Sequence, residues 1–204
     1  MPDFGHTLSD EELMGRVQAG DTAMFAELVR RYQPALARVA ASRLGRADWA
    51  EDAVQETFLA AFKGRHTYRP PHSFRTWLWT ILLNQCRRSW KVRARRPRIR
   101  GWGDEPAELV EPAVFQASVE RGESSPLTRL LAQERAGLVD ELLKQLTPVQ
   151  ADAVRLRFFG GLKFEEIAEA TGCSLGTAKS RVKWGLLRLA ELVRHAEPIQ
   201  RDDL

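Results

Sequence analysis

Two groups of basic side chains have the types and spacing needed to bind a polyanion. In the stretch EEIAEATGCSLGTAKSRVKWGLLRLAEL (165–192), Lys179, Arg181 and Lys183 follow a break in the helical pattern. A second group lies near the middle of the chain, in a segment (87–96) that contains no acidic residue: Arg87, Arg88, Lys91, Arg93, Arg95 and Arg96. The net charge of +4 is weak evidence alone, but clustered cations attract phosphates strongly, with a steep dependence on salt. Both groups therefore indicate a nucleic-acid partner.

Side chains that could do catalytic or metal chemistry do not gather in this way. His66 and His72 have no carboxylate or cysteine arranged to complete a catalytic or metal site. Cys86 and Cys173 lie far apart and form no CxxC pair, so we interpret them as ordinary reduced thiols. We therefore expect no enzymatic activity, no catalytic residue, no metal site and no cofactor.

The first basic group requires a helix that restarts after a short turn. Gly172 can take the left-handed conformation that ends a helix, and Ser174 can cap the next one, with Thr177 as a second candidate. Two helices so closely joined must cross steeply, as in a helix-turn-helix. The helical pattern predicts an apolar stripe that packs on the preceding helices: Leu175, Ala178, Val182, Leu186, Leu189 and Val193. The opposite side, small and basic in its first half, could enter a major groove; lysines that merely solvate a surface helix are the alternative.

The second basic group ends a helix predicted from Phe74 to about Arg95. The segment before it, GRHTYRPPHS (64–73), contains a glycine and two prolines and is predicted to be a loop. Its aromatic and cationic side chains suit contact with unstacked bases: His66, Tyr68, Arg69 and His72. A plain surface loop is the alternative interpretation.

Helical patterns also predict the other elements. Ser9 and Glu12 form a capping box, and Asp21 can cap a helix that ends at Gly45. A helix from about Asp48 to Phe62 has one apolar face: Val54, Phe58, Leu59 and Phe62. Further helices are predicted at 127–146 and from Pro148 to about Phe159, and no segment shows sustained period-two alternation.

The pattern is lost between Gly101 and Ser125, where acidic residues, glycines and prolines are frequent. We therefore expect an all-α fold of two small helical domains, residues 9–96 and 127–196, joined by a flexible acidic linker at 97–126. The longest apolar run, Trp77 to Leu83, is far shorter than a membrane span, and no signal-peptide pattern is present. We expect a soluble, intracellular protein with no membrane partner.

Three stretches resemble the extracytoplasmic-function (ECF) group of the sigma-70 family of bacterial sigma factors. They are EDAVQETFLAAFKG, FRTWLWTILLNQCRRSW and LTPVQADAVRLRFFGGLKFEEIAEATGCSLGTAKSRV. The resemblance implies a cytoplasmic protein that binds core RNA polymerase, at the clamp region of the β′ subunit and the flap of β, and directs it to promoter DNA. The N-terminal domain is implied to read and help melt the −10 element, and the C-terminal domain to read the −35 element. An anti-sigma factor is a further implied partner.

The resemblance also implies roles for residues that match by position. Asp52, Gln55 and Glu56 match the helix that docks on the polymerase clamp. The loop from His66 to Ser73 matches the loop that captures a flipped −10 base, and the −10 helix is matched by Asn84, Arg87 and Arg88, followed by Lys91. The −35-reading positions are matched by Lys179, Ser180, Lys183 and Trp184, with Arg181 nearby for phosphate.

Two other functions compete with this interpretation. A helix-turn-helix transcriptional regulator that is not a polymerase subunit would need a ligand pocket or dimer face, and neither is evident in the sequence. A nuclease would need paired carboxylates or histidines near the basic helix, whereas the acidic residues cluster in the linker and in the predicted docking helix.

Overall fold

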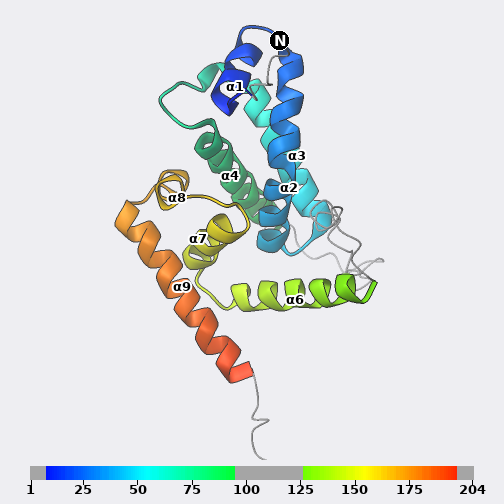
Figure 1. Ribbon diagram of the computed structural model, residues 1–204, viewed down its shortest axis with the longest axis vertical. Helices are drawn as coiled ribbons and strands as arrows, with labels where there is room; N and C mark the ends of the chain where they lie inside the picture. Colours follow the sequence, from blue (N-terminus) through cyan, green and yellow to red (C-terminus); the bar gives the residue numbers. More distant parts are fainter. Residues whose placement is uncertain (1–7, 95–125, 197–204) are drawn as a thin grey trace, which may run out of the picture. The chain divides into compact units, whose positions relative to one another are not determined.

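The computed structural model describes residues 8–94 and 126–196, and it gives side chains for residues 8–91 and 134–195. The chain divides into two compact units, one within residues 1–110 and one within residues 111–204. All regular structure in the described ranges is helical (Figure 1), so the predicted all-α fold is confirmed. The predicted linker, 97–126, lies outside the described residues except for Pro126, which begins a helix.

The first unit contains four α-helices and two short 3-10 helices in its described part. They are α1 (Asp10–Gln18), η1 (Thr22–Met24), α2 (Phe25–Leu44), α3 (Ala47–Lys63), η2 (Arg65–Thr67) and α4 (Phe74–Ala94). Ser9 and Glu12 form the predicted capping box at the start of α1, and Gly45 ends α2 with a φ of 69°. The prediction for Asp21 is wrong, because this residue precedes η1 and its side chain makes no capping hydrogen bond.

The core of the first unit lies where α2, α3 and α4 pack against one another, with α1 against α2 and α4 (Figure 1). Leu28, Leu36 and Trp79 are fully buried there. Aromatic rings fill the space near the start of α2, where Phe25 meets Phe62 edge-on with ring centroids 5.3 Å apart. This core fixes the direction in which α3 and α4 present their outer faces.

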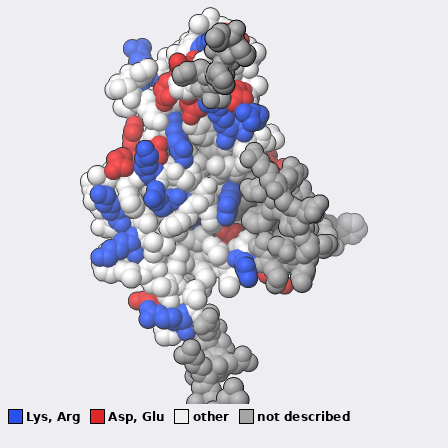
Figure 2. Space-filling view, viewed as in Figure 1, with Lys and Arg blue, Asp and Glu red and all other residues white. Residues whose placement is uncertain are grey.

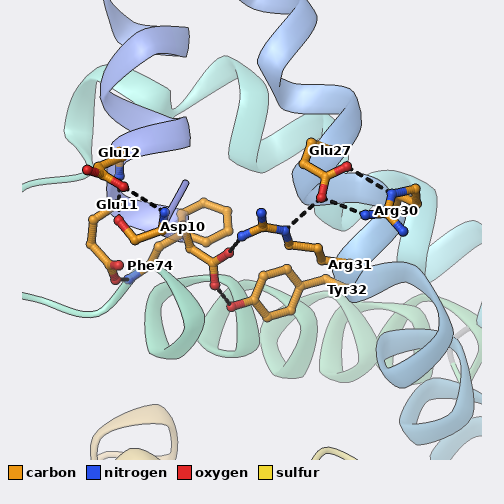
Figure 3. Close-up of polar contacts among 9 residues, drawn as sticks. Asp10, Glu11, Glu12, Glu27, Arg30, Arg31, Tyr32 and Phe74 are labelled. Carbon is orange, nitrogen blue, oxygen red and sulfur yellow. Dashed lines mark hydrogen bonds and ion pairs between the residues drawn. The ribbon is translucent and has the colours of Figure 1, made fainter. Parts of the chain in front are cut away.

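A polar network joins α1 to α2 (Figure 3). Arg31 donates from Nη1 to Asp10 Oδ1 at 2.8 Å and from Nε to Glu27 Oε1 at 2.9 Å. The hydroxyl of Tyr32 donates to Asp10 Oδ2, and Arg30 donates twice to Glu27, at 2.8 and 2.7 Å. The hydrogen bonds from Arg30 and Arg31 lower the pKa of Glu27 from 4.5 to about 2.

This depressed pKa predicts an acid-dependent stability. The Glu27 carboxylate contributes stability above its unfolded pKa of 4.5, and that contribution is lost as the pH falls towards about 2. Urea unfolding of the first unit, measured between pH 7 and pH 2.5, should show a smaller loss of stability over this window in Glu27→Gln than in the wild-type chain. Equal slopes in the two proteins would contradict the prediction. Because the carboxylate is solvent-accessible, the effect should also shrink at high salt.

The second unit contains four α-helices in its described part. They are α6 (Pro126–Lys144), α7 (Pro148–Phe158), α8 (Phe164–Thr171) and α9 (Leu175–Ala196). Leu143 and Leu146 pack with Ala151 and Val154 of α7 in a small core, which Leu189 of α9 covers. None of the helices in the described residues is long and apolar enough to cross a lipid bilayer.

Arg157 fixes the connection between α7 and α8. Its Nη1 donates to the carbonyl oxygen of Leu162 at 2.8 Å, and its guanidinium carbon lies 5.0 Å from the centroid of the Phe164 ring. At the start of α8, the backbone N–H of Lys163 donates to Glu166 Oε2 at 2.7 Å. This satisfies one half of a capping box, although a lysine side chain has no acceptor to supply the other half.

Candidate nucleic-acid interface

The turn between α8 and α9 has the predicted chemistry. Gly172 ends α8 with a φ of 63°, and the N–H of Cys173 donates to the carbonyl oxygen of Ala168 at 2.9 Å. Ser174 Oγ accepts the N–H of Thr177 at 3.1 Å, so it caps α9 as predicted. Both helix ends are therefore satisfied within a few residues, and α9 contacts α8 as well as α7.

The outer face of α9 is small and basic in its first half. Lys179, Ser180, Lys183 and Trp184 are exposed, and Arg181 is partly buried beside them. The ammonium of Lys183 lies 5.6 Å from the ring centroid of Trp184, a cation–π distance, and Trp184 is 57% exposed. Figure 2 shows basic atoms on the left of the view, where Figure 1 places the start of α9. Exposed ammonium, guanidinium and hydroxyl groups of this kind are hydrogen-bond donors that suit base edges and phosphates.

The packed face of α9 differs from the predicted apolar stripe. Ala178 and Val182 are buried and Leu189 packs on the small core, as predicted. The prediction is wrong for three other members of the stripe, because their side chains are substantially exposed: Leu175, Leu186 and Val193. The contact with α7 runs through Gly185 instead, where a Cβ atom would lie only 2.8 Å from Val154 Cγ2. A glycine has no side chain, so a pattern of apolar residues cannot reveal that it lies on the packed face. The predicted stripe was therefore rotated away from the face that actually packs on α7.

The second half of α4 presents a basic face of helical spacing. Asn84, Arg87, Arg88 and Lys91 are all exposed, whereas Cys86 between them is fully buried. Arg87 donates from Nη1 to Asn84 Oδ1 at 3.0 Å, which holds the two side chains together. The remaining cations of this group lie beyond the described side chains: Arg93, Arg95 and Arg96.

The loop before α4 is built differently from the prediction at one residue. Tyr68 is only 3% exposed, with its ring 5.8 Å from that of Phe74 and 5.5 Å from that of Trp77. Its hydroxyl donates to the carbonyl oxygen of His72 at 2.8 Å, and burial raises the pKa of the phenol. The expectation that Tyr68 stacks on an unpaired base is therefore corrected, because its ring belongs to the core.

The other loop residues of the prediction face solvent. His66, Arg69 and His72 are all exposed, and the two prolines between Arg69 and His72 are exposed as well. The loop thus exposes one guanidinium and two imidazoles, while the ring of Tyr68 in the same loop is buried.

The outer face of α3 carries acidic and amide groups. Asp52, Gln55 and Glu56 are exposed, opposite the buried Ala53 and Val54. Leu59 is 48% exposed and lies one turn beyond Gln55 and Glu56 on the same side. The prediction that assigned Leu59 to the core face is therefore wrong, and this exposed leucine extends the acidic face with an apolar contact point.

Both units match family models of known proteins. The family model for Sigma-70 region 2 matches residues 28–96, and the model for Sigma-70, region 4 matches residues 136–189. The RNA polymerase sigma-H factor of Pseudomonas aeruginosa is 32% identical over 173 residues, which cover 85% of this chain and 88% of that protein. The ECF RNA polymerase sigma-E factor of Haemophilus influenzae is 32% identical over 175 residues, covering 86% and 90%.

Two solved structures share the fold. CnrH in complex with the cytosolic domain of CnrY matches with a TM-score of 0.69 and 23% identity, covering 92% of this chain and 99% of that chain. The sigma factor RpoE in complex with the anti-sigma factor NepR, from Bartonella quintana, matches with a TM-score of 0.58 and 25% identity, covering 83% and 96%.

Proposed function

Since the chain belongs to the ECF group of the sigma-70 family of RNA polymerase sigma factors, we propose that its two helical domains read the two promoter elements by different physical means. The protein is a sigma factor, a non-catalytic polymerase subunit that directs promoter recognition in transcription initiation. The proposed domains are residues 9–96 for the −10 element and residues 127–196 for the −35 element, with 97–126 as linker. The cytoplasm, which holds the bacterial chromosome and its polymerase, is the proposed site of action.

This division between the domains is supported by one observation. Each unit exposes a basic helix face, and within the described residues the first unit adds an exposed loop that carries Arg69 and two histidines. A helix face of small and basic residues suits the major groove of duplex DNA. A loop beside a basic helix suits an extruded base, because its groups can surround a base that has left the stack. A regulator that acts without polymerase is set aside, because the chain matches both region 2 and region 4 of sigma-70 proteins.

In the −35 domain, Lys179, Ser180, Lys183 and Trp184 are the proposed base-reading residues, and Arg181 is the proposed phosphate contact. The partial burial of Arg181 supports a fixed position at the edge of the groove. The cation–π contact with the Trp184 ring restrains the position of the Lys183 ammonium. A restrained donor loses less side-chain entropy when it binds, which favours base reading over a loose phosphate contact.

We expect Lys183→Ala to reduce discrimination for the preferred −35 element by about 1–3 kcal/mol. Duplex affinity would be measured on preferred and scrambled −35 sequences at several salt concentrations. Arg194→Ala is a matched control, because Arg194 is an exposed cation in the last turn of the same helix. Equal losses on both sequences, with a salt slope reduced by about one, would make Lys183 a phosphate contact.

In the −10 domain, Asn84, Arg87, Arg88 and Lys91 are the proposed contacts to the promoter. The exposed loop residues His66, Arg69 and His72 are the proposed groups around a flipped base. Tyr68 is not proposed as a contact, because its ring is buried. Arg87→Ala and Arg88→Ala are expected to weaken promoter binding broadly, since phosphate contacts carry no sequence information directly.

The face of Asp52, Gln55 and Glu56 on α3 is the proposed docking surface for the clamp region of the β′ subunit of core polymerase. The −35 domain is proposed to contact the flap of the β subunit. We expect Gln55→Ala combined with Glu56→Ala to weaken binding to core enzyme by about tenfold, or roughly 1.4 kcal/mol. Competition for core polymerase against a labelled wild-type chain measures this, with circular dichroism to check helicity. Asp21→Ala removes an exposed carboxylate of the first unit away from α3; it serves as control and should bind normally.

Run-off transcription with purified core polymerase on a promoter library tests the proposal as a whole. Selected promoters should contain two conserved elements, and scrambling either one should lower transcription. Selection of a single element, or transcription that is indifferent to the −35 sequence, would contradict the division between domains. An anti-sigma factor is a further proposed partner, supported by the similar RpoE in complex with the anti-sigma factor NepR.

A further inference from the structure

Two side chains of α1 contact the loop before α4, one at each end of it. Gln18 donates from Nε2 to the carbonyl oxygen of Arg65 at 2.7 Å and to that of Tyr68 at 3.0 Å. Glu11 Oε1 accepts the backbone N–H of Phe74, the first residue of α4, at 3.2 Å (Figure 3). The loop between these contacts carries the exposed residues Arg69 and His72.

Helix α1 is itself firmly held, so its contacts can position the loop. Leu13, Met14 and Val17 are at most 2% exposed and pack into the core. On its polar side, Asp10 accepts from Arg31 and from the hydroxyl of Tyr32 (Figure 3). A rigid element that donates to loop carbonyls restricts the shapes the loop can adopt before it binds anything.

We propose that Gln18 and Glu11 are positioning residues for promoter opening, holding the loop in the shape that accepts an unpaired base of the −10 element. This inference rests on the proposed function of the loop. Gln18 and Glu11 precede the segment that matches sigma-70 region 2, which begins at residue 28. Neither residue needs to touch DNA, because a loop ordered in advance avoids the entropic cost of being ordered upon binding.

The geometry gives each residue a distinct requirement. Gln18 acts as a donor to two carbonyl oxygens, so a carboxylate at this position cannot replace it. Glu11 acts as an acceptor at the N-terminus of α4, so a glutamine can replace it whereas an alanine cannot. These opposite requirements make conservative substitutions informative.

The test uses the holoenzyme assembled from core polymerase and the full chain. The probe is a single-stranded oligonucleotide with the non-template −10 sequence of a promoter that the wild-type holoenzyme transcribes. Gln18→Ala, Gln18→Glu and Glu11→Ala should each bind this probe about tenfold more weakly, as expected for the loss of one or two hydrogen bonds. They should also slow strand opening in permanganate footprinting. Glu11→Gln and the control Arg16→Ala, on an exposed residue of α1, should match the wild-type protein.

Affinity for core polymerase and for duplex −35 DNA should stay unchanged in all five variants, which separates positioning from a general structural role. The inference is overturned if probe affinity is normal in both Gln18→Ala and Glu11→Ala, or if core affinity and probe affinity fall together. If Gln18→Ala lowers the melting temperature, the Glu11 variants decide whether the inference holds: Glu11→Ala should bind the probe more weakly than Glu11→Gln, and equal affinities would overturn it. Arg69→Ala and His72→Ala test the loop itself: full probe affinity in both would refute the proposed loop function, whichever result α1 gives.

Discussion

Replacing Gly185 by valine should destabilise the second unit more than any change to the exposed basic residues of α9 that are proposed to contact DNA. Gly185 lies where α9 crosses α7, and a Cβ atom there would lie 2.8 Å from Val154 Cγ2 and 3.6 Å from Leu146 Cδ1. Val154 is 5% exposed and β-branched, so it has little freedom to move away. The two helices would have to separate, and overpacking of this kind costs about 1–3 kcal/mol.

The loss would be large relative to the stability of such a small domain. At roughly 0.05–0.15 kcal/mol per residue, a domain of about 70 residues is stable by about 4–10 kcal/mol. Gly185→Ala should cost less than Gly185→Val, because alanine recovers about 1 kcal/mol of helix propensity and adds only one methyl group. The exposed basic face of α9 would lose its support, so the affinity for duplex −35 DNA that we propose for it should fall together with stability.

Chemical denaturation followed by circular dichroism measures the effect, together with duplex −35 binding. Gly137→Ala is the matched control: Gly137 lies within α6, and a Cβ atom added there meets nothing within 4 Å. That control should raise the stability of the domain by about 0.5–1 kcal/mol through helix propensity alone. If Gly185→Ala behaved like Gly137→Ala, the close contact between α7 and α9 would be wrong.

The helix-turn-helix shows which part of this unit the sequence could predict. Its turn was predictable because Gly172 and Ser174 act through their own backbone and the next few residues. The packed face of α9 was not, because it depends on how closely α7 approaches. The same limit applies to Leu59: it is apolar and has the helical spacing of a core residue, yet its side chain is 48% exposed.

Long-range contacts account for the other differences. Gln18 donates to carbonyl oxygens of residues 47 and 50 positions away in the chain, and a backbone partner cannot be recognised from the pattern of side chains.

The basic face of α4 was predictable, because charge and helical period together place Asn84, Arg87, Arg88 and Lys91 on one side. The functions of these residues remain predictions.

Tyr68 illustrates how a loop can hide a core residue. The glycine and prolines around it correctly predict irregular backbone, and irregular backbone suggested an exposed ring. The ring instead packs against Phe74 and Trp77 in the first turn of α4, and its hydroxyl donates to the carbonyl oxygen of His72. A loop of this kind is stabilised by the side chain that it buries.

We therefore expect Tyr68→Ala to lower the free energy of unfolding of the −10 domain by about 3–5 kcal/mol, the range for removing a large buried aromatic ring. Core polymerase binding should weaken along with promoter opening, because the whole domain is affected. Tyr68→Phe should cost only about 1 kcal/mol, since it keeps the ring and loses one hydrogen bond, to the carbonyl oxygen of His72.

The two roles of Tyr68 can be separated by measuring stability and opening on the same variants. If Tyr68 stacked on a base, Tyr68→Ala would leave unfolding and core binding unchanged and would slow only the opening step in permanganate footprinting. If the ring is core, opening should fall only to the extent that the folded fraction falls, and cooling Tyr68→Ala well below its melting temperature should restore part of it. A stable Tyr68→Ala with a specific opening defect would return Tyr68 to the DNA interface and require the loop to release its ring before a base is captured.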